Sequence, residues 1–193
     1  NQTLNFIESA AKEFATKYTV SGVILDNYYF SENAESYLGY IKSGSMTGYE
    51  NYLYQINKNL IKTVTDTFKA TNKRIQTGIY TDPVWANKAN NQAGSDTSAA
   101  FESLYDGFCD VKYYVESGMF NFIVVEALTS LSDKAEPFEV VVKWWSQLAS
   151  NNNISLYVVH AEDKLASGST GFTSPDQIVN QLMKIKSLGG YGG

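Results

Sequence analysis

Two acidic residues stand at the ends of apolar segments, where a carboxylate is unexpected. Asp26 follows residues 22–25 (GVIL), and Glu126 lies in the apolar segment 121–127. Burying a carboxylate costs free energy unless the group is paired or used in chemistry. Hydrolysis of a glycosidic bond uses two carboxyl groups, an acid and a nucleophile or base, about 5–9.5 Å apart. We therefore predict Asp26 as nucleophile and Glu126 as acid; the alternative is that each caps a helix or forms a salt bridge.

Other polar and aromatic side chains follow the same apolar segments and are predicted to share one cleft with this pair. Trp85 lies in a long loop, where an exposed ring can stack on a sugar. His160 is the only histidine, and it either contacts a ligand or is simply held by hydrogen bonds. The predicted substrate-binding residues are Asn27, Tyr28, Tyr29, Tyr80, Asp82, Trp85 and His160.

The elements that must position these residues alternate between strands and helices. Short apolar runs predict strands at residues 22–26, 74–80, 121–127 and 154–160. Helical spacing predicts helices at residues 4–18, 49–68, 98–108, 110–117, 138–148 and 174–188. The polar segments 31–47 and 81–96 are predicted loops, and the second is long enough to be functional. Strands separated by helices favour a parallel sheet, whose ligands bind at the carboxyl ends of its strands.

Four such strands make half of a (β/α)8 barrel. The chain has 193 residues, whereas a complete barrel typically needs about 200–250 or more. An open flavodoxin-like sheet has the same local pattern, but its phosphate-binding signature does not occur in this sequence. We therefore predict an α/β fold of the TIM-barrel type, a single domain over residues 1–193 that covers about the last four to five βα units. The final segment, residues 189–193, is predicted to be a turn into a strand that the chain lacks.

Composition excludes several classes of function. The net charge is −5, and the 15 Lys and Arg residues form no basic run, so we expect no nucleic-acid partner. Cys109 is the only cysteine, and without a Cys/His cluster neither a metal nor another cofactor is expected. No apolar run approaches the roughly 20 residues of a membrane span. The expected partners are a carbohydrate and either the missing N-terminal half of the barrel or a second copy.

Several motifs occur in a characteristic order. Residues 17–28 (KYTVSGVILDNY) match the pattern KYDVDGIHFDDY, and residues 78–88 with 94–97 match GISPFGIWRNK followed by GSDT. Tyr105-Asp106 with Phe122-Ile123, and Trp144-Trp145 with Leu156-Tyr157, follow at the matching places. This order resembles the tenth family of glycosyl-hydrolase-like barrels, which are bacterial secreted and surface proteins. The resemblance implies a TIM barrel that hydrolyses O-glycosidic bonds of a polysaccharide, at a secreted or cell-surface location.

Departures from the family pattern fall at the predicted site. Asn27 replaces the second Asp of the first motif, residues 80–83 replace Ser-Pro-Phe-Gly, and Val125-Glu126 replaces Pro-Gln. An Arg-rich helix start is replaced by residues 52–57. Three interpretations therefore remain open: a glycoside hydrolase that uses Asp26 and Glu126, a non-catalytic carbohydrate-binding module, and a structural surface domain.

Overall fold

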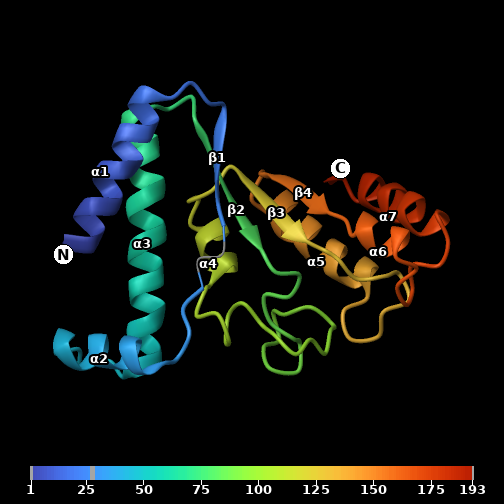
Figure 1. The fold of residues 1–193 in the computed structure, drawn as a ribbon, viewed down its shortest axis with the longest axis horizontal. Coiled ribbons are helices and arrows are strands. Elements are labelled where there is room, and N and C mark those ends of the chain that lie inside the picture. Colours follow the sequence, from blue (N-terminus) through green and yellow to red (C-terminus); the bar gives the residue numbers. More distant parts are fainter. Residues whose placement is uncertain (1, 27–28, 193) are drawn as a thin grey trace.

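The apolar runs of the sequence form one parallel sheet. The computed structural model describes residues 2–26 and 29–192 (Figure 1). Its strands lie in the order of the sequence, each parallel to its neighbours: β1 (Gly22–Leu25), β2 (Gln76–Thr81), β3 (Phe122–Glu126), β4 (Ser155–Val159) and β5 (Tyr191–Gly192). Because consecutive strands pair without reversal of their order, this is part of a (β/α)8 barrel and not an open sheet with a switch point.

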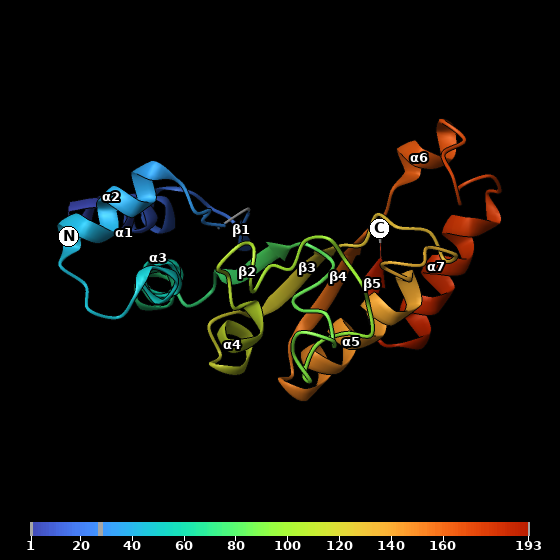
Figure 2. The ribbon, with the colours of Figure 1, turned by 90° about the horizontal axis from the view of Figure 1, so that it is seen from below.

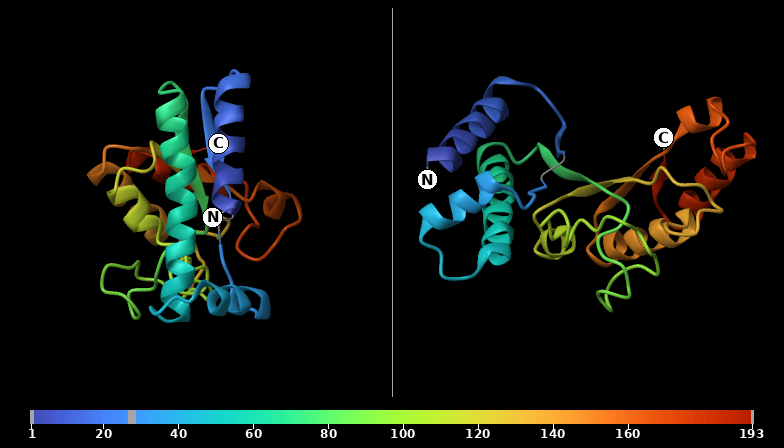
Figure 3. Two further views of the ribbon diagram at one scale, coloured as in Figure 1. Left: turned by 90° about the vertical axis from the view of Figure 1, so that its left-hand side faces the viewer. Right: turned by 60° about the horizontal axis from the view of Figure 1, so that its bottom comes forward.

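Helices connect the strands and cover one face of the sheet. They are α1 (Gln2–Lys17), α2 (Ala34–Ser43), α3 (Tyr49–Thr71), α4 (Val111–Glu116), α5 (Phe138–Asn151), α6 (Glu162–Ala166) and α7 (Asp176–Ser187). Figure 2 shows α4, α5 and α7 on the same side of the strands. Helix α1 runs beside α3 (Figure 3). The Phe14 ring of α1 meets the Phe68 ring of α3 edge to face. None of the helices within residues 2–26 and 29–192 is both long and apolar enough to cross a lipid bilayer.

The core lies between the sheet and these helices. Leu53, Ile61 and Phe68 form a buried stripe on α3, and Val141 and Trp145 do the same on α5. Burying a large apolar side chain stabilises a fold by about 1.5–3 kcal/mol. The periodicity that predicted the helices therefore also orients them on the sheet.

The opposite face of the sheet would be the interior of a closed barrel. Side chains alternate along a strand, so the residues beside the buried Leu25 and Leu156 point to this face. Ile24 is 52% exposed and Tyr157 is 44% exposed there. Within the described residues, Figure 2 shows no helix across this face of the central strands.

Three local expectations were wrong. Residues 98–108 form turns instead of a helix, because the buried Glu102 carboxylate accepts hydrogen bonds from Asn87 N and Asn90 Nδ2 in the preceding loop. The predicted loop 31–47 contains α2, whose start is closed by a capping box between Asn33 and Ser36. The final segment does form a short strand, β5, which pairs with β4.

One contact on the barrel-interior face leads to a stability prediction. A Cβ atom on Gly78 would lie 2.1 Å from Cε2 of Phe122, because that ring covers the glycine on the neighbouring strand. We expect Gly78→Ala to destabilise the fold by about 1–3 kcal/mol, the usual cost of overpacking. Urea unfolding measures the loss. In a Phe122→Leu background the added cost should shrink; an equal loss in both backgrounds would contradict this contact.

Candidate active site

Parallel pairing brings the carboxyl ends of the strands to one edge, the lower edge in Figure 1. The register pairs Thr81 with Val125. The next residues along these two strands, Asp82 and Glu126, therefore leave the sheet side by side. Neighbouring strands lie about 4.8 Å apart, so two carboxylates enter one small region from adjacent strands.

A pocket of about 230 Å³ opens at this edge. Two predicted site residues line it, Asp82 and Glu126, and the others come from three connecting segments. The lining residues are Asp82, Pro83, Phe101, Glu126, Leu128, Thr129, Glu136 and Lys164. Sequence reasoning missed Phe101 and Glu136, and the only signal for Glu136 was its place in the polar segment that follows a strand end.

Glu136 is the most perturbed carboxyl group in this pocket. Burial raises its pKa above the usual range, and the negative charges of Asp133 and Asp82 raise it further, while Lys164 acts in the opposite direction. Its backbone is fixed, because Glu136 N donates to Asp133 Oδ1 at 2.8 Å and its carbonyl accepts from Thr129 Oγ1 at 2.7 Å. A carboxyl group whose pKa is raised by burial is suited to general-acid catalysis.

Lys164 is the cation of the pocket. Its Nζ donates a 2.9 Å hydrogen bond to the Leu128 carbonyl and lies 6.0 Å from the centre of the Phe172 ring. These contacts tie α6 to the loop after β3. The lysine therefore partly balances the charges of the pocket carboxylates from a fixed position.

Tyr80 lies on the barrel-interior face between Asp26 and Glu126. Burial raises the pKa of Tyr80 to about 12, and the charges of Glu126 and Asp26 add to this effect. The phenol therefore keeps its proton at neutral pH. It is available as a hydrogen-bond donor to a carboxylate or a sugar oxygen.

Asp26 is exposed at the end of the edge strand β1. The register pairs Leu25 with Ile79, so Asp26 stands beside Tyr80 and two strands away from Glu126. At about 4.8 Å per strand, the backbones at Asp26 and Glu126 lie roughly 10 Å apart across the sheet. The pair Asp26 and Glu126 stays a prediction, and Asp82 is the closer neighbour of Glu126. Asn27 and Tyr28 lie outside the described residues.

Tyr29 contacts two residues that line the pocket, Asp82 and Phe101. Asp82 N donates to the Tyr29 hydroxyl at 2.9 Å, and that hydroxyl lies 3.4 Å from Thr81 Oγ1. The ring meets Phe101 edge to face at 5.5 Å. Burial raises the pKa of Tyr29. This residue therefore holds the start of the β2–α4 loop in place.

Four predicted binding residues in the described part of the chain do not line this pocket, namely Tyr29, Tyr80, Trp85 and His160. Trp85 is 6% exposed; its Nε1 donates to Asp110 Oδ1 at 3.0 Å and its ring stacks on Trp144. It therefore presents no open ring to a sugar, and that expectation is corrected.

His160 packs on the Phe138 ring, with its Nδ1 3.0 Å from Gln181 Oε1. These contacts favour the alternative of a histidine held by its neighbours, although its Nε2 is buried without a hydrogen-bond partner among the described residues. In the described part of the chain, no group of three or more His, Cys, Asp and Glu residues is arranged to hold a metal ion.

Comparisons with known proteins identify the family of this chain. A profile of the family described as "Glycosyl hydrolase-like 10" matches residues 1–172. The glycosyl hydrolase DigH of Escherichia coli (strain K12) is 28% identical over 182 residues, which cover 91% of this chain and 40% of that protein. The glycosyl hydrolase YngK of Bacillus subtilis (strain 168) is 24% identical over 194 residues, 95% of this chain and 38% of that protein. The chain thus spans about two fifths of these relatives.

A solved structure supports the fold. The crystal structure of the catalytic domain of beta-amylase from Paenibacillus polymyxa superposes with a TM-score of 0.52 at 12% sequence identity. The match covers 99% of this chain and 61% of that one. At this identity the likeness concerns the fold alone, and it agrees with a partial TIM barrel.

The raised pKa of Glu136 predicts that removing its charge stabilises the fold, and that this gain depends on pH. Because its pKa is raised on folding, the folded state loses stability as pH rises above the ordinary value of 4.5. We expect Glu136→Gln to unfold at higher urea concentration than wild type at pH 7, with the difference shrinking toward pH 4.5. Glu162→Gln, an exposed change outside the pocket, serves as control. A difference that stays constant with pH would contradict the raised pKa.

Proposed function

We propose that this chain, which belongs to the glycosyl hydrolase-like 10 family, forms the carboxylate site of a glycoside hydrolase that cleaves an O-glycosidic bond of a polysaccharide. The observation that carries the proposal is the single pocket lined by Asp82, Glu126 and Glu136 at the strand ends. Glycoside hydrolysis needs two carboxyl groups with different protonation states. At Glu136, burial and the neighbouring negative charges favour the protonated form.

Glu136 takes the role of general acid in this proposal. Burial raises its pKa, and the charges of Asp133 and Asp82 add to this effect, which favours the protonated form that the leaving glycosidic oxygen needs. Sequence reasoning had assigned the acid role to Glu126. The desolvated surroundings of Glu136 favour it instead.

Glu126 takes the second role, as nucleophile or as the base that activates water. The Tyr80 phenol, whose pKa is raised by the same carboxylate, can orient it by donating a hydrogen bond. Asp26 is the other candidate for this role, on the opposite side of Tyr80. In either case the nucleophile, or the water it activates, replaces the leaving oxygen at the anomeric carbon, and that oxygen receives the proton of Glu136.

Aromatic side chains beside the carboxylates suit a carbohydrate. Phe101 lines the pocket and is 39% exposed, and Tyr80 adds a phenol on the barrel-interior face. Such rings offer an apolar face to the carbon–hydrogen side of a sugar, while carboxylates and hydroxyls bind its polar edge. A secreted or cell-surface location, which the family resemblance implies, is part of the same proposal.

The exposed barrel-interior face indicates that further strands must cover it to complete the proposed site. Ile24 and Tyr157 are largely exposed on it, and a TIM barrel fills this space with side chains from further strands. We propose that these strands come from the N-terminal half of the barrel or from a second copy of the chain. A complete sugar cleft would then lie between the two halves.

Glu136→Gln tests the assignment of the acid. In the full-length gene product, we expect the kcat for a natural glycan to fall by about 10²–10⁴-fold, the usual contribution of a general acid. Glycosides with a dinitrophenyl leaving group should lose much less, because that group departs without a proton. Steady-state hydrolysis of both substrates, with Glu162→Gln as control, measures this contrast. Equal losses on both substrates would exclude Glu136 as the acid.

Glu126→Gln and Asp26→Asn test the second role in the same assay. We expect Glu126→Gln to abolish hydrolysis of both substrate types, because no leaving group replaces a missing nucleophile or base. If Asp26→Asn abolishes hydrolysis and Glu126→Gln does not, the role belongs to Asp26. A gene product that binds glycans but cleaves none would instead be a carbohydrate-binding module.

A further inference from the structure

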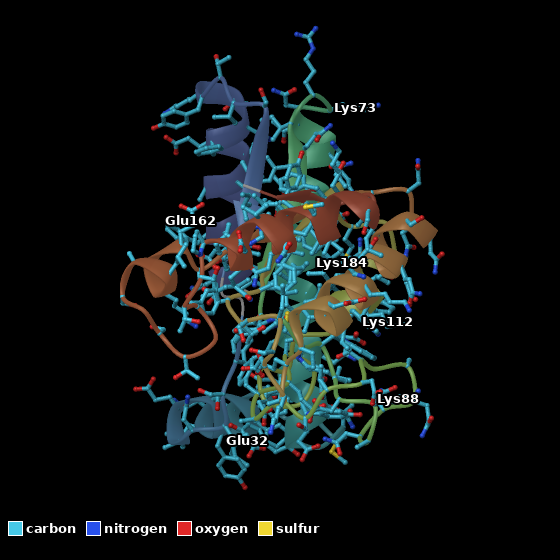
Figure 4. All side chains as sticks on the ribbon, turned by 90° about the vertical axis from the view of Figure 1, so that its right-hand side faces the viewer. Glu32, Lys73, Lys88, Lys112, Glu162 and Lys184 are labelled. Atoms are coloured by element: carbon cyan, nitrogen blue, oxygen red, sulfur yellow. The ribbon has the colours of Figure 1, made fainter. Side chains whose placement is uncertain are left out.

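A second hollow lies on the outer, helix-covered side of the fold. It has a volume of about 380 Å³ and lies between the β2–α4 loop and α5. Its main lining residues are Lys88, Asp96, Val140, Lys143, Trp144 and Gln147. None of them lines the strand-end pocket. Figure 4 shows Lys88 on the opposite side of the molecule from Glu162, which begins α6 beside the barrel-interior face.

Trp144 lines this hollow and packs against two other tryptophans. Its ring stacks on Trp85 with centroids 5.6 Å apart and planes at 14°, and it meets Trp145 edge to face at 4.8 Å. Its Nε1 donates to the Ala93 carbonyl at 2.9 Å. Trp145 is fully buried and Trp85 is 6% exposed, whereas Trp144 remains partly exposed. The core thus uses the first two rings, and the third is presented at the surface.

Hydrogen bonds hold the part of the β2–α4 loop that lines the hollow. The Asn87 amide accepts from Thr97 Oγ1 at 2.8 Å and donates to the Ala99 carbonyl at 3.0 Å. Asn90 Nδ2 donates to Glu102 Oε1 at 2.6 Å. These bonds close the loop on both sides of the rim residues. A site built in this way loses little conformational entropy when a ligand binds.

The chemistry around Trp144 is that of a sugar site. Val140, Lys143, Trp144 and Gln147 share one stripe of α5 by helical spacing. An indole face flanked by an amide, by amines and by the Asp96 carboxylate offers stacking together with donors and an acceptor for hydroxyl groups. Lys88 and Lys143 outnumber the single acid, so a sugar that carries a carboxylate also fits.

We propose that this hollow is an accessory carbohydrate-binding site, with Trp144 as its stacking platform. It would hold a stretch of polysaccharide on the outside of the barrel, away from the strand-end carboxylates. Binding at this hollow involves no cleavage, so it does not depend on the proposed hydrolysis.

Calorimetric titration with two probes tests the proposal. The probes are a neutral gluco-oligosaccharide and an oligouronate of equal length, each added to the full-length gene product in a Glu136→Gln background that prevents turnover by the proposed acid. We expect at least one probe to bind, and Trp144→Ala to weaken that binding about tenfold or more, as for a tryptophan at the centre of a binding site. Lys134→Ala, an exposed change outside both pockets, should leave the affinity unchanged.

A second variant covers the case in which Trp144→Ala disturbs the fold. Lys143 and Gln147 are exposed on α5, so the double change Lys143→Ala/Gln147→Ala spares the tryptophan stack and should still weaken binding several-fold. Binding of neither probe, or a calorimetric stoichiometry and affinity that both variants leave unchanged, would overturn the proposal. Hydrolysis of a small soluble glycoside should be unaffected by Trp144→Ala, so failure of this site and failure of the catalytic proposal give different results.

Discussion

Parallel pairing of consecutive strands is the constraint on which the rest of the structure depends. Each strand must return to the same end of the sheet before the next begins, so helices fill the return path and cover one face. All strand carboxyl ends then meet at one edge. Asp82 and Glu126 become neighbours only because Thr81 pairs with Val125. A shift by one residue would turn their side chains to the other face.

The electrostatic character of the strand-end pocket follows from this geometry. Carboxylates delivered from neighbouring segments repel one another, and partial burial adds a desolvation cost. Burial and these negative charges raise the pKa of Glu136, while Lys164 from α6 lowers it in part. The pocket thus holds a carboxyl group, Glu136, whose pKa lies above its ordinary value. Acid–base cleavage of a sugar linkage uses such a group as its acid.

Local sequence signals predicted the strands and most of the helices because apolar periodicity is set by neighbouring residues. They also placed Asp82 and Glu126 correctly at strand ends. Glu136 could not be found in this way, since its burial depends on segments far apart in the chain. Trp85 was misjudged for the same reason: its ring is covered by Trp144 from a later helix. Phe101, Leu104 and Phe108 imitate helical spacing, but the segment forms turns in which the buried Glu102 carboxylate accepts hydrogen bonds from the preceding loop.

Carboxylates that share the strand-end pocket should interact, and the pKa of Glu136 reports on that interaction most directly. A ¹³C NMR titration of the glutamate carboxyl groups, with and without Asp82→Asn, measures this value. The account predicts a Glu136 pKa above the ordinary 4.5 that falls when the Asp82 charge is removed. A value at or below 4.5 in the wild type, or a raised value that Asp82→Asn leaves unchanged, would contradict it.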